Sequence, residues 1–255
     1  MTDRDHLPGA HPGQPSAQHG GRAPVGEELA RLARDLQQQE TPQAVLERIV
    51  ASAVGVVPGA EDATITRVLG RRRVTSVAAT GERARRLDEL QDETGQGPCL
   101  DALFRQQTVR VGDLAAETRW PRLAERVGEI GARSMLCLQL FVEGEDLGAL
   151  DLIASGPDAF DDESEDVGLL FAAQAAVALA DAQQAQDLRT AMTSRNLIGQ
   201  AQGILMERHK ITAEQAFALL AKVSQDRNVK LRDLAEELIF SGQLHVPGSR
   251  RRDRA

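Results

Sequence analysis

The spacing of apolar residues divides the chain into a sheet-like middle and helical flanks. Apolar and polar positions alternate in short runs between residues 62 and 155, which predicts strands at 62–69, 73–80, 108–114, 134–142 and 147–155. The last two runs, SMLCLQLFV and LGALDLIAS, flank the acidic turn EGED and predict a hairpin. Short helices are predicted between the strands, at 87–94, 97–106 and 119–131. Because short helices mix with antiparallel strands, we predict an α+β domain.

Two amphipathic helices are predicted before the sheet. Apolar residues fall at positions 29, 32, 33 and 36, and again at 44, 45, 49 and 50, which is helical spacing. Thr41-Pro42 supplies a capping hydroxyl and a favourable first residue for the second helix. Residues 1–26 are rich in Pro, Gly, His, Gln and Ser, and we predict that they are disordered.

A long helix is predicted from Asp161 onward. The segment opens with DDESED, and acidic residues stabilise a helix N-terminus. One seam then recurs every three to four residues: Leu170, Ala173, Val177, Ala180, Gln184 and Leu188. Such a seam favours a coiled-coil contact in a homodimer. A helix docked on its own domain is the alternative. Because almost no linker precedes the next helical segment, we expect one stiff helix to join two domains.

Three helical segments fill residues 188–242 and predict a small bundle. The second begins at Thr212, where Gln215 completes a capping box, and Phe217 is expected in its core-facing stripe. On a helical wheel, the core sector of the first segment holds Leu197, Ile198, Ala201, Ile204 and Leu205.

Gly199 and Gly203 lie outside that core sector. Each glycine destabilises a helix interior by about 1 kcal/mol relative to alanine. The wheel leaves two explanations open. The glycines are either tolerated sequence variation, or a bare backbone that lets a partner helix or a nucleic acid approach.

Charge is distributed unevenly between the two halves. The 255-residue chain has a formal net charge of −8, yet residues 188–255 hold 12 Lys and Arg against 7 Asp and Glu. A basic end on an acidic body favours a polyanionic partner for that end. Part of the excess lies in the tail SRRRDRA, for which a solubilising role is the alternative. Aromatic residues make up only 3% of the chain, so base stacking can contribute little to any recognition of RNA.

Several classes of protein are excluded by these patterns. No apolar run approaches the roughly 20 residues of a membrane span, and the N-terminus lacks the apolar core of a secretory signal. Cys99 and Cys137 form no disulfide framework, which favours a reducing cytoplasm. The five histidines show no metal-ligand spacing. Because the sequence has no nucleophile–base constellation and no dinucleotide-binding glycine loop, we predict no catalytic residue and no metal site.

Three runs near the C-terminus carry a family resemblance: IGQAQGILM, AFALL and SQDRNVKLRDLA. Together they cover roughly residues 188–242 and resemble an ANTAR domain. Members of that family bind RNA, typically capture paired hairpins in nascent transcripts, and prevent a terminator hairpin from forming. They usually act as dimers. The resemblance therefore implies an RNA-binding transcription antitermination regulator that forms a homodimer.

The resemblance implies that the start of the third helix contacts RNA. Lys230 and Arg232 are cations at a helix N-terminus, where they oppose the helix dipole, so a phosphate contact explains them better than stability does. Capping of the third helix is the alternative role for Asn228. Gln202 stands where many members have lysine. The further RNA-contact candidates are Asn228, Ser224, Arg195, Gln202, Gly203, Arg208 and Lys210.

The order of elements in residues 27–186 resembles a GAF domain, a six-stranded α+β sensor fold. The run GQGPCLDAL, followed by VRVGDL, resembles GAF domains fused to ANTAR domains in actinobacteria. GAF domains bind small molecules or chromophores in a pocket on one face of the sheet, and the resemblance names no cofactor. Cys99 and Trp120 are the candidate pocket or redox residues. Burial in the hydrophobic core is the alternative for both.

The sequence thus predicts four segments: a disordered segment 1–26, a GAF-like sensor 27–186, an ANTAR unit 187–243 and a basic disordered tail 244–255. Two other functions stay open. The three helices could form a DNA-binding unit, although Asp233, Glu236 and Glu237 on the third helix would repel phosphate. A thiol enzyme built around Cys99 and Cys137 is the second alternative, and no paired motif supports it.

Overall fold

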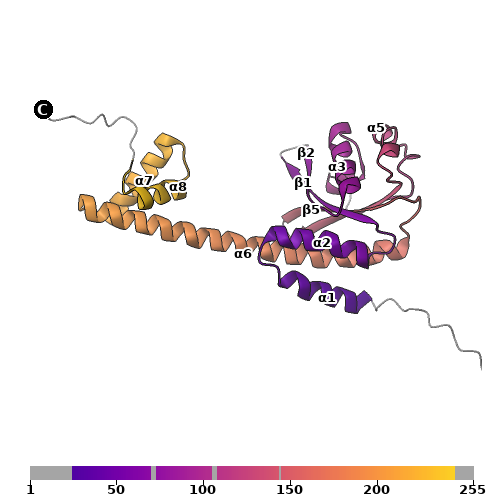
Figure 1. Ribbon diagram of the computed structural model, residues 1–255, viewed down its shortest axis with the longest axis horizontal. Coiled ribbons are helices and arrows are strands. Elements are labelled where there is room, and N and C mark those ends of the chain that lie inside the picture. Colours follow the sequence, from indigo (N-terminus) through magenta and orange to yellow (C-terminus); the bar gives the residue numbers. More distant parts are fainter. Residues whose placement is uncertain (1–24, 70–72, 105–107, 144, 245–255) are drawn as a thin grey trace, which may run out of the picture.

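The computed structural model describes residues 25–69, 73–104, 108–143 and 145–244. The chain forms a mixed sheet-and-helix unit and a C-terminal helical unit, and one long helix, α6 (Asp162–His209), runs through both (Figure 1). The expected stiff connection is therefore confirmed. Residues 1–24 and 245–255, for which disorder is predicted, lie outside the described residues, and so do parts of the GRRR and EGED turns.

Five antiparallel strands form the sheet, in the order β2-β1-β5-β4-β3. Their bounds are β1 Asp62–Leu69, β2 Arg73–Ala79, β3 Thr108–Val111, β4 Ser134–Val142 and β5 Glu145–Ala154. These are the five segments that the alternating pattern predicts, and β4 and β5 form the predicted hairpin. The GAF resemblance implies six strands, but the described part of the chain forms five. Turns and short helices, and no further strand, occupy the stretch between β3 and β4.

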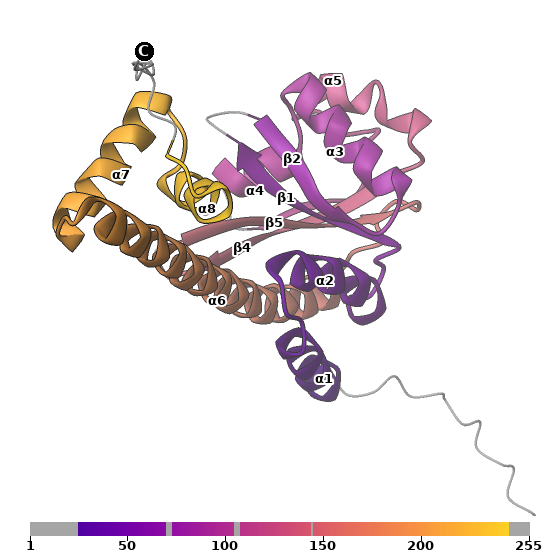
Figure 2. The same cartoon turned by 60° about the vertical axis from the view of Figure 1, so that its left-hand side comes forward.

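Helices cover both faces of the sheet (Figures 1 and 2). On one face, α2 and the first half of α6 pack against the strands, and α1 packs on them. On the other face lie α3, α4 and α5. The bounds are α1 Val25–Gln37, α2 Pro42–Val56, α3 Glu82–Thr94, α4 Pro98–Phe104 and α5 Pro121–Ala124. The helix α1 begins two residues before the predicted start of the sensor.

One predicted helix is wrong. The stretch 119–131 forms only α5 and a single 3₁₀ turn, η1 (Val127–Glu129). Gly128 weakens the helix, and Gly131 adopts a φ of +73°, which helical residues do not have.

The central strands are apolar on both faces because both faces are covered. In β4, Leu136, Leu138 and Leu140 contribute to the core beneath α2 and α6, whereas Met135 and Cys137 contribute to the core beneath α3 and α4. The alternation along each strand therefore sorts residues between two separate cores.

The helix α6 begins with a capping box in which the Asp161 carboxylate accepts the Ser164 backbone N–H and the Ser164 hydroxyl accepts the Asp161 N–H. Its first half buries Phe171, Ala175 and Leu179 against the sheet unit. Its last turns bury Ala201 and Leu205 against α7 (Ala213–Arg227) and α8 (Leu231–Ser241).

The C-terminal bundle forms as predicted, including the capping box of Thr212 and Gln215 at the start of α7. Its buried core is entirely apolar and consists of Ala201, Leu205, Ala216, Leu220, Val223, Leu234, Ala235 and Leu238. The prediction for Phe217 is wrong, since 45% of this residue is exposed. It follows Ala216 by one position and so falls beside the buried stripe of α7.

Candidate functional site

The turn between α7 and α8 holds the principal candidates for RNA contact. Asn228 has a left-handed backbone (φ 51°, ψ 42°), and its N–H donates to the carbonyls of Ser224 and Gln225. It therefore ends α7, and the alternative of a cap on the third helix is wrong. Lys230 is the residue that precedes α8, and its side chain makes no capping hydrogen bond. Lys230 is exposed, and no hydrogen bond or ion pair to another described residue holds its ammonium group.

Most of the other candidate side chains are already engaged within the bundle. The Arg232 guanidinium pairs with the neighbouring Asp233 at 3.1 Å, and the Ser224 hydroxyl donates to the Val229 carbonyl at 2.6 Å. Ser224 lies in the last turn of α7, which ends at Arg227. The remaining bonds join Gln202 to the Ala213 carbonyl, Arg208 to the Gly242 carbonyl and Lys210 to Glu207. Arg195 is exposed and, like Lys230, makes no such bond within the described residues.

The two glycines of α6 lie on an open surface. A Cβ atom built at Gly199 or Gly203 would meet no heavy atom within 4 Å outside its own helix. The prediction that both glycines lie outside the core sector of the helix is therefore confirmed. Nothing in a single chain requires glycine at either position.

The seam predicted on α6 faces solvent in the single chain. Leu170, Val177 and Leu188 are 55%, 53% and 58% exposed, and Ala173 and Gln184 are also exposed. The buried residues of α6 lie on the opposite side of the helix. Ala180 is half-buried against the sheet unit. The alternative of a helix docked on its own domain is therefore correct for the first half of α6, which packs on the sheet unit through the face opposite to the exposed seam residues.

A buried polar cluster lies on the sheet face beneath α3 and α4. Strands supply four of its members. Thr64 on β1 and Cys137 on β4 both pair in register with Asp151 on β5, so their side chains share one face of the sheet. Thr66 donates a hydrogen bond to the Asp151 carboxylate at 3.0 Å, and its hydroxyl lies 2.8 Å from the Cys99 sulfur.

The helices α3 and α4 supply the other three members. Asp88 and Gln91 are one turn apart on α3 and are buried side by side. The side-chain amide oxygen of Gln91 accepts the backbone N–H of Cys99, the second residue of α4, at 3.0 Å. The buried polar cluster therefore consists of Thr64, Thr66, Asp88, Gln91, Cys99, Cys137 and Asp151, and each of these residues is at most 3% exposed.

Several atoms of this cluster have no hydrogen-bond partner within the described protein. They are both carboxylate oxygens of Asp88, Oδ1 of Asp151, the Thr64 hydroxyl and Nε2 of Gln91. Burial raises the pKa of Asp88 well above its ordinary value and the nearby Asp151 raises it further, whereas the neighbouring hydroxyls of Thr64 and Ser76 oppose this increase. Burial likewise raises the pKa of Asp151. The cluster is thus rich in acceptors and lacks a cation.

The two thiols are held in the neutral form. Burial is the main cause that raises the pKa of Cys99 and of Cys137 well above the ordinary value, and Asp151 is the next. Both cysteines are free and fully buried. Nucleophilic or redox chemistry needs an accessible thiolate, which this environment opposes.

Local backbone geometry explains the two glycines of the GQG segment. Gly95 ends α3 in the left-handed conformation. Gly97 has a φ of +153°, and a Cβ there would lie 2.3 Å from the Gln91 Oε1 atom. The segment therefore lets Gln91 reach the N-terminus of α4. Trp120 is 4% exposed and donates its indole N–H to Asp101 at 3.2 Å, so it fills the core and does not line an open pocket.

Sequence reasoning found Cys99 and missed Asp88, Asp151, Gln91 and the two threonines. One signal was available. Asp151 stands at the centre of the otherwise apolar run LGALDLIA, where a strand covered on both faces normally has no charge. Asp88 and Gln91 gave no comparable signal, because an acidic helix such as LDELQDET is usually exposed.

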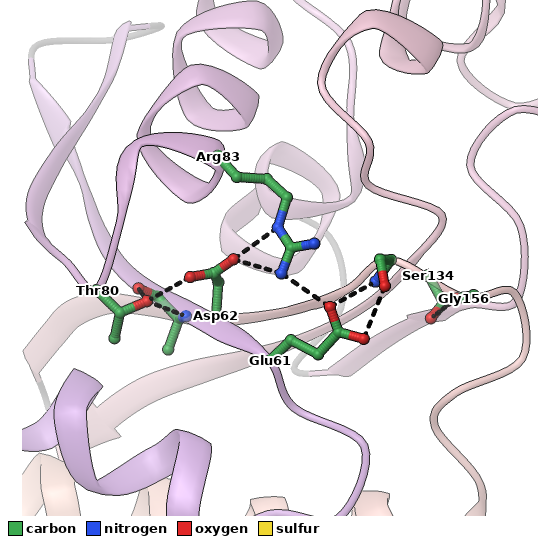
Figure 3. A network of polar contacts seen from close by, with 8 residues as sticks. Glu61, Asp62, Thr80, Arg83, Ser134 and Gly156 are labelled. Carbon is green, nitrogen blue, oxygen red and sulfur yellow. Dashed lines mark hydrogen bonds and ion pairs between the residues drawn. The ribbon is translucent and has the colours of Figure 1, made fainter.

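A second polar network, where β1 begins and β5 ends, joins charged groups of opposite sign (Figure 3). Arg83 on α3 bonds Asp62 at 2.6 Å and Glu61 at 2.8 Å. Thr80 donates to Asp62, and Ser155 donates its hydroxyl to Glu61 at 2.8 Å. The Ser155 hydroxyl is the first cause of the lowered pKa of Glu61. Because every partner is matched, we interpret this network as a clamp between α3 and the sheet.

The described residues hold neither a metal-ligand cluster nor a membrane-spanning helix. No group of three or more His, Cys, Asp or Glu side chains in this part of the chain has the arrangement of a metal site. None of the described helices is long and apolar enough to cross a membrane.

Solved structures with GAF domains share the fold of the N-terminal unit. A free methionine-R-sulfoxide reductase from Neisseria meningitidis, crystallised with its substrate, is 19% identical, with a TM-score of 0.50 over 63% of this chain and 91% of that one. The GAF domain of a phosphoenolpyruvate-protein phosphotransferase from Coxiella burnetii is 16% identical, with the same TM-score over 63% and 95%. A phycocyanobilin-bound GAF domain from a cyanobacterial phytochrome is 15% identical, again at 0.50, over 64% and 98%. No curated protein matches the chain.

Sequence models of two families match the chain in succession. The GAF domain model matches residues 39–180, and the ANTAR domain model matches residues 186–239. A sensor-type domain followed by an antitermination-type domain is the architecture of a regulator. The chain therefore belongs to the GAF domain family and, with the ANTAR domain that follows, is a GAF-ANTAR protein.

Proposed function

We propose that this protein is an RNA-binding transcription antitermination regulator. Its ANTAR unit binds paired hairpins in nascent mRNA, and its GAF unit controls that binding. The single observation that carries the proposal is Lys230. It is an exposed cation beside an ordered turn, without any partner in the described chain, within a domain of a family that binds RNA. The bundle stability does not require this ammonium group, so phosphate contact explains it best.

Support for a homodimer comes from α6. An apolar seam that stays more than half exposed at Leu170, Val177 and Leu188 destabilises a lone helix in water and favours a second copy of it. Two α6 helices packed along this seam would carry two bundles, one for each hairpin. The seam ends before Gly199, which leaves the bare backbone of Gly199 and Gly203 for a closer approach of the partner helix or of RNA.

Signal transfer follows from the continuity of α6. The same helix packs on the sheet through Phe171 and on α7 and α8 through Leu205. A ligand that favours one packing of the sensor on α6 would shift the population of α6 pairing and so of RNA-competent dimers.

The first alternative is a DNA-binding regulator. It needs a recognition helix with base-reading side chains, whereas α8 presents Asp233 and Glu236 to solvent. The second alternative, a thiol enzyme, needs an accessible thiolate, and both thiols are buried and neutral. Both observations favour a regulator that is not an enzyme.

The test of the proposal is a binding titration of the full chain against a two-hairpin leader RNA and the matching duplex DNA. We expect binding to RNA that weakens with salt. Lys230→Ala should reduce the affinity by about 1–2 kcal/mol and lower the salt slope by about one counterion. Lys222→Ala, an exposed lysine on α7 outside the candidate turn, is the matched control and should change both quantities little. Equal losses for both variants, or tighter binding to DNA, would contradict the assignment.

A further inference from the structure

The unpartnered atoms of the buried polar cluster point to a missing group. Buried polar atoms almost always have a hydrogen-bond partner, and each unsatisfied atom in a folded protein needs an explanation. Here five such atoms occur in four neighbouring residues of one core, namely Thr64, Asp88, Gln91 and Asp151. No other described side chain of the protein has a buried nitrogen or oxygen atom without a partner.

A hollow lies beside this core. It lies between β2 and α3, has a volume of about 390 Å³, and is lined by Val74, Thr75, Ser76, Arg85, Asp88, Glu89 and Asp92. Asp88 is the only charged member of this lining that is buried. Asp88 therefore lines the hollow and also belongs to the buried cluster behind it, where its carboxylate oxygens are closed to solvent.

The unpartnered donors and acceptors of the cluster indicate the chemical class of its ligand. Three unpartnered carboxylate oxygens can accept hydrogen bonds, the Thr64 hydroxyl can accept or donate, and Nε2 of Gln91 can only donate. The nearest basic side chain of the lining, Arg85, pairs with Glu82 at 3.2 Å and is 53% exposed. The protein thus places two carboxyl groups together and supplies no cation to them.

We propose that this hollow is the sensor site and that it binds a small organic cation through a primary ammonium group. The ammonium N–H groups donate to Asp88 and Asp151, and Gln91 donates to an acceptor elsewhere on the ligand. This inference rests on the proposed sensor role of the GAF unit and adds the chemical class of its ligand. It involves binding alone, with no covalent step.

Cation binding in this site is coupled to proton release. Without ligand, burial keeps Asp88 protonated to a higher pH than usual, whereas an ammonium group selects the ionised carboxylate. We therefore expect affinity to increase with pH until the pKa of the free Asp88 is reached. The titratable and charged groups that face Asp88 are Asp151 on β5, Glu89, Arg85 and Asp92 on α3, Cys99 on α4 and Cys137 on β4.

The experiment compares two probes of equal charge on the full chain, in the absence of RNA. Methylammonium has three N–H donors, and tetramethylammonium has none. Their binding is measured by calorimetry at pH 6, 7 and 8, and the carboxyl ¹³C shift of Asp88 reports ionisation. We expect methylammonium to bind about tenfold more tightly per pH unit, with release of one proton, and tetramethylammonium not to bind.

Asp88→Asn removes the charge and keeps the shape, so it should abolish binding and its pH dependence. Glu125→Gln, at an exposed acid that follows α5 and lies outside the lining of the hollow, is the control and should retain both. Equal binding of the two probes, undiminished binding to Asp88→Asn, or no binding of methylammonium at millimolar concentration would overturn the inference. A change in RNA affinity is measured separately, so methylammonium binding without an effect on RNA would contradict the proposed coupling and leave the ligand class intact.

Discussion

The interiors of the two units differ in kind. The core of the ANTAR bundle contains only Ala, Leu and Val, and its polar side chains lie outside. The core beneath α3 and α4 of the GAF unit holds two carboxyl groups and an amide in which some or all polar atoms lack partners. An apolar core gives stability, whereas unsatisfied polar groups reduce it. The difference indicates that the bundle acts through its surface and the GAF unit through its interior.

The charges of the two units support the same comparison. Lys230 and Arg195 are exposed cations without partners among the described residues. Asp88 and Asp151, in contrast, are fully buried acids whose pKa values are raised by burial. Exposed cations favour binding of a polyanion that stays hydrated at the protein surface. Buried acids favour binding of a small ligand that is desolvated when it enters the core.

The largest expected effect concerns the apolar core of the bundle. Leu220→Ala removes a side chain that is fully buried between the three helices, so we expect a loss of about 2–5 kcal/mol in its free energy of unfolding. The GAF unit should remain folded. Hydrogen exchange resolved by region measures both. Phe217→Ala, at an exposed neighbouring position, should change the stability by less than about 1 kcal/mol, and an equal loss would contradict the described packing.

A second effect concerns the buried acids and pH. An acid whose pKa is raised by folding contributes stability that is fully present below its unfolded value, near 3.8, and is lost as the pH rises through the folded value. We expect Asp88 to lower the unfolding free energy by up to about 1.4 kcal/mol per pH unit within that window. Denaturant titrations of the wild type and Asp88→Asn from pH 4 to 8 measure the difference. Parallel curves would show that Asp88 is not buried as an acid.

The smallest expected effects concern two glycines. Gly97→Ala should destabilise the GAF unit by about 1–3 kcal/mol, because its φ of +153° and the contact with Gln91 both oppose a side chain. Gly203→Ala should stabilise α6 by about 1 kcal/mol, since its surroundings are open. Thermal unfolding tests both. If Gly203→Ala also leaves RNA affinity and dimerisation unchanged, close approach at this backbone is ruled out and sequence variation is the better explanation.

The sequence was sufficient for elements with a regular pattern. Alternation located all five strands, and the acidic start and three-to-four spacing located α6. It failed where local and tertiary factors compete: Gly131 interrupts a helix-like run, and Phe217 lies beside a buried stripe. The buried polar cluster was the hardest feature to predict. Its residues come from β1, β5, α3 and α4 and lie up to 87 positions apart in the sequence, so no short sequence motif indicates that they are in contact.

The most direct test of the account compares RNA with two hairpins and RNA with one. If α6 pairs two bundles, the wild type should bind the two-hairpin RNA at least about a hundredfold more tightly than the single hairpin, through effective concentration. Leu188→Glu, in the exposed seam, should yield a monomer by ultracentrifugation and remove that difference, and Thr190→Glu, exposed on the other side of α6, should retain it. Equal affinity of the wild type for both RNAs would contradict the central claim.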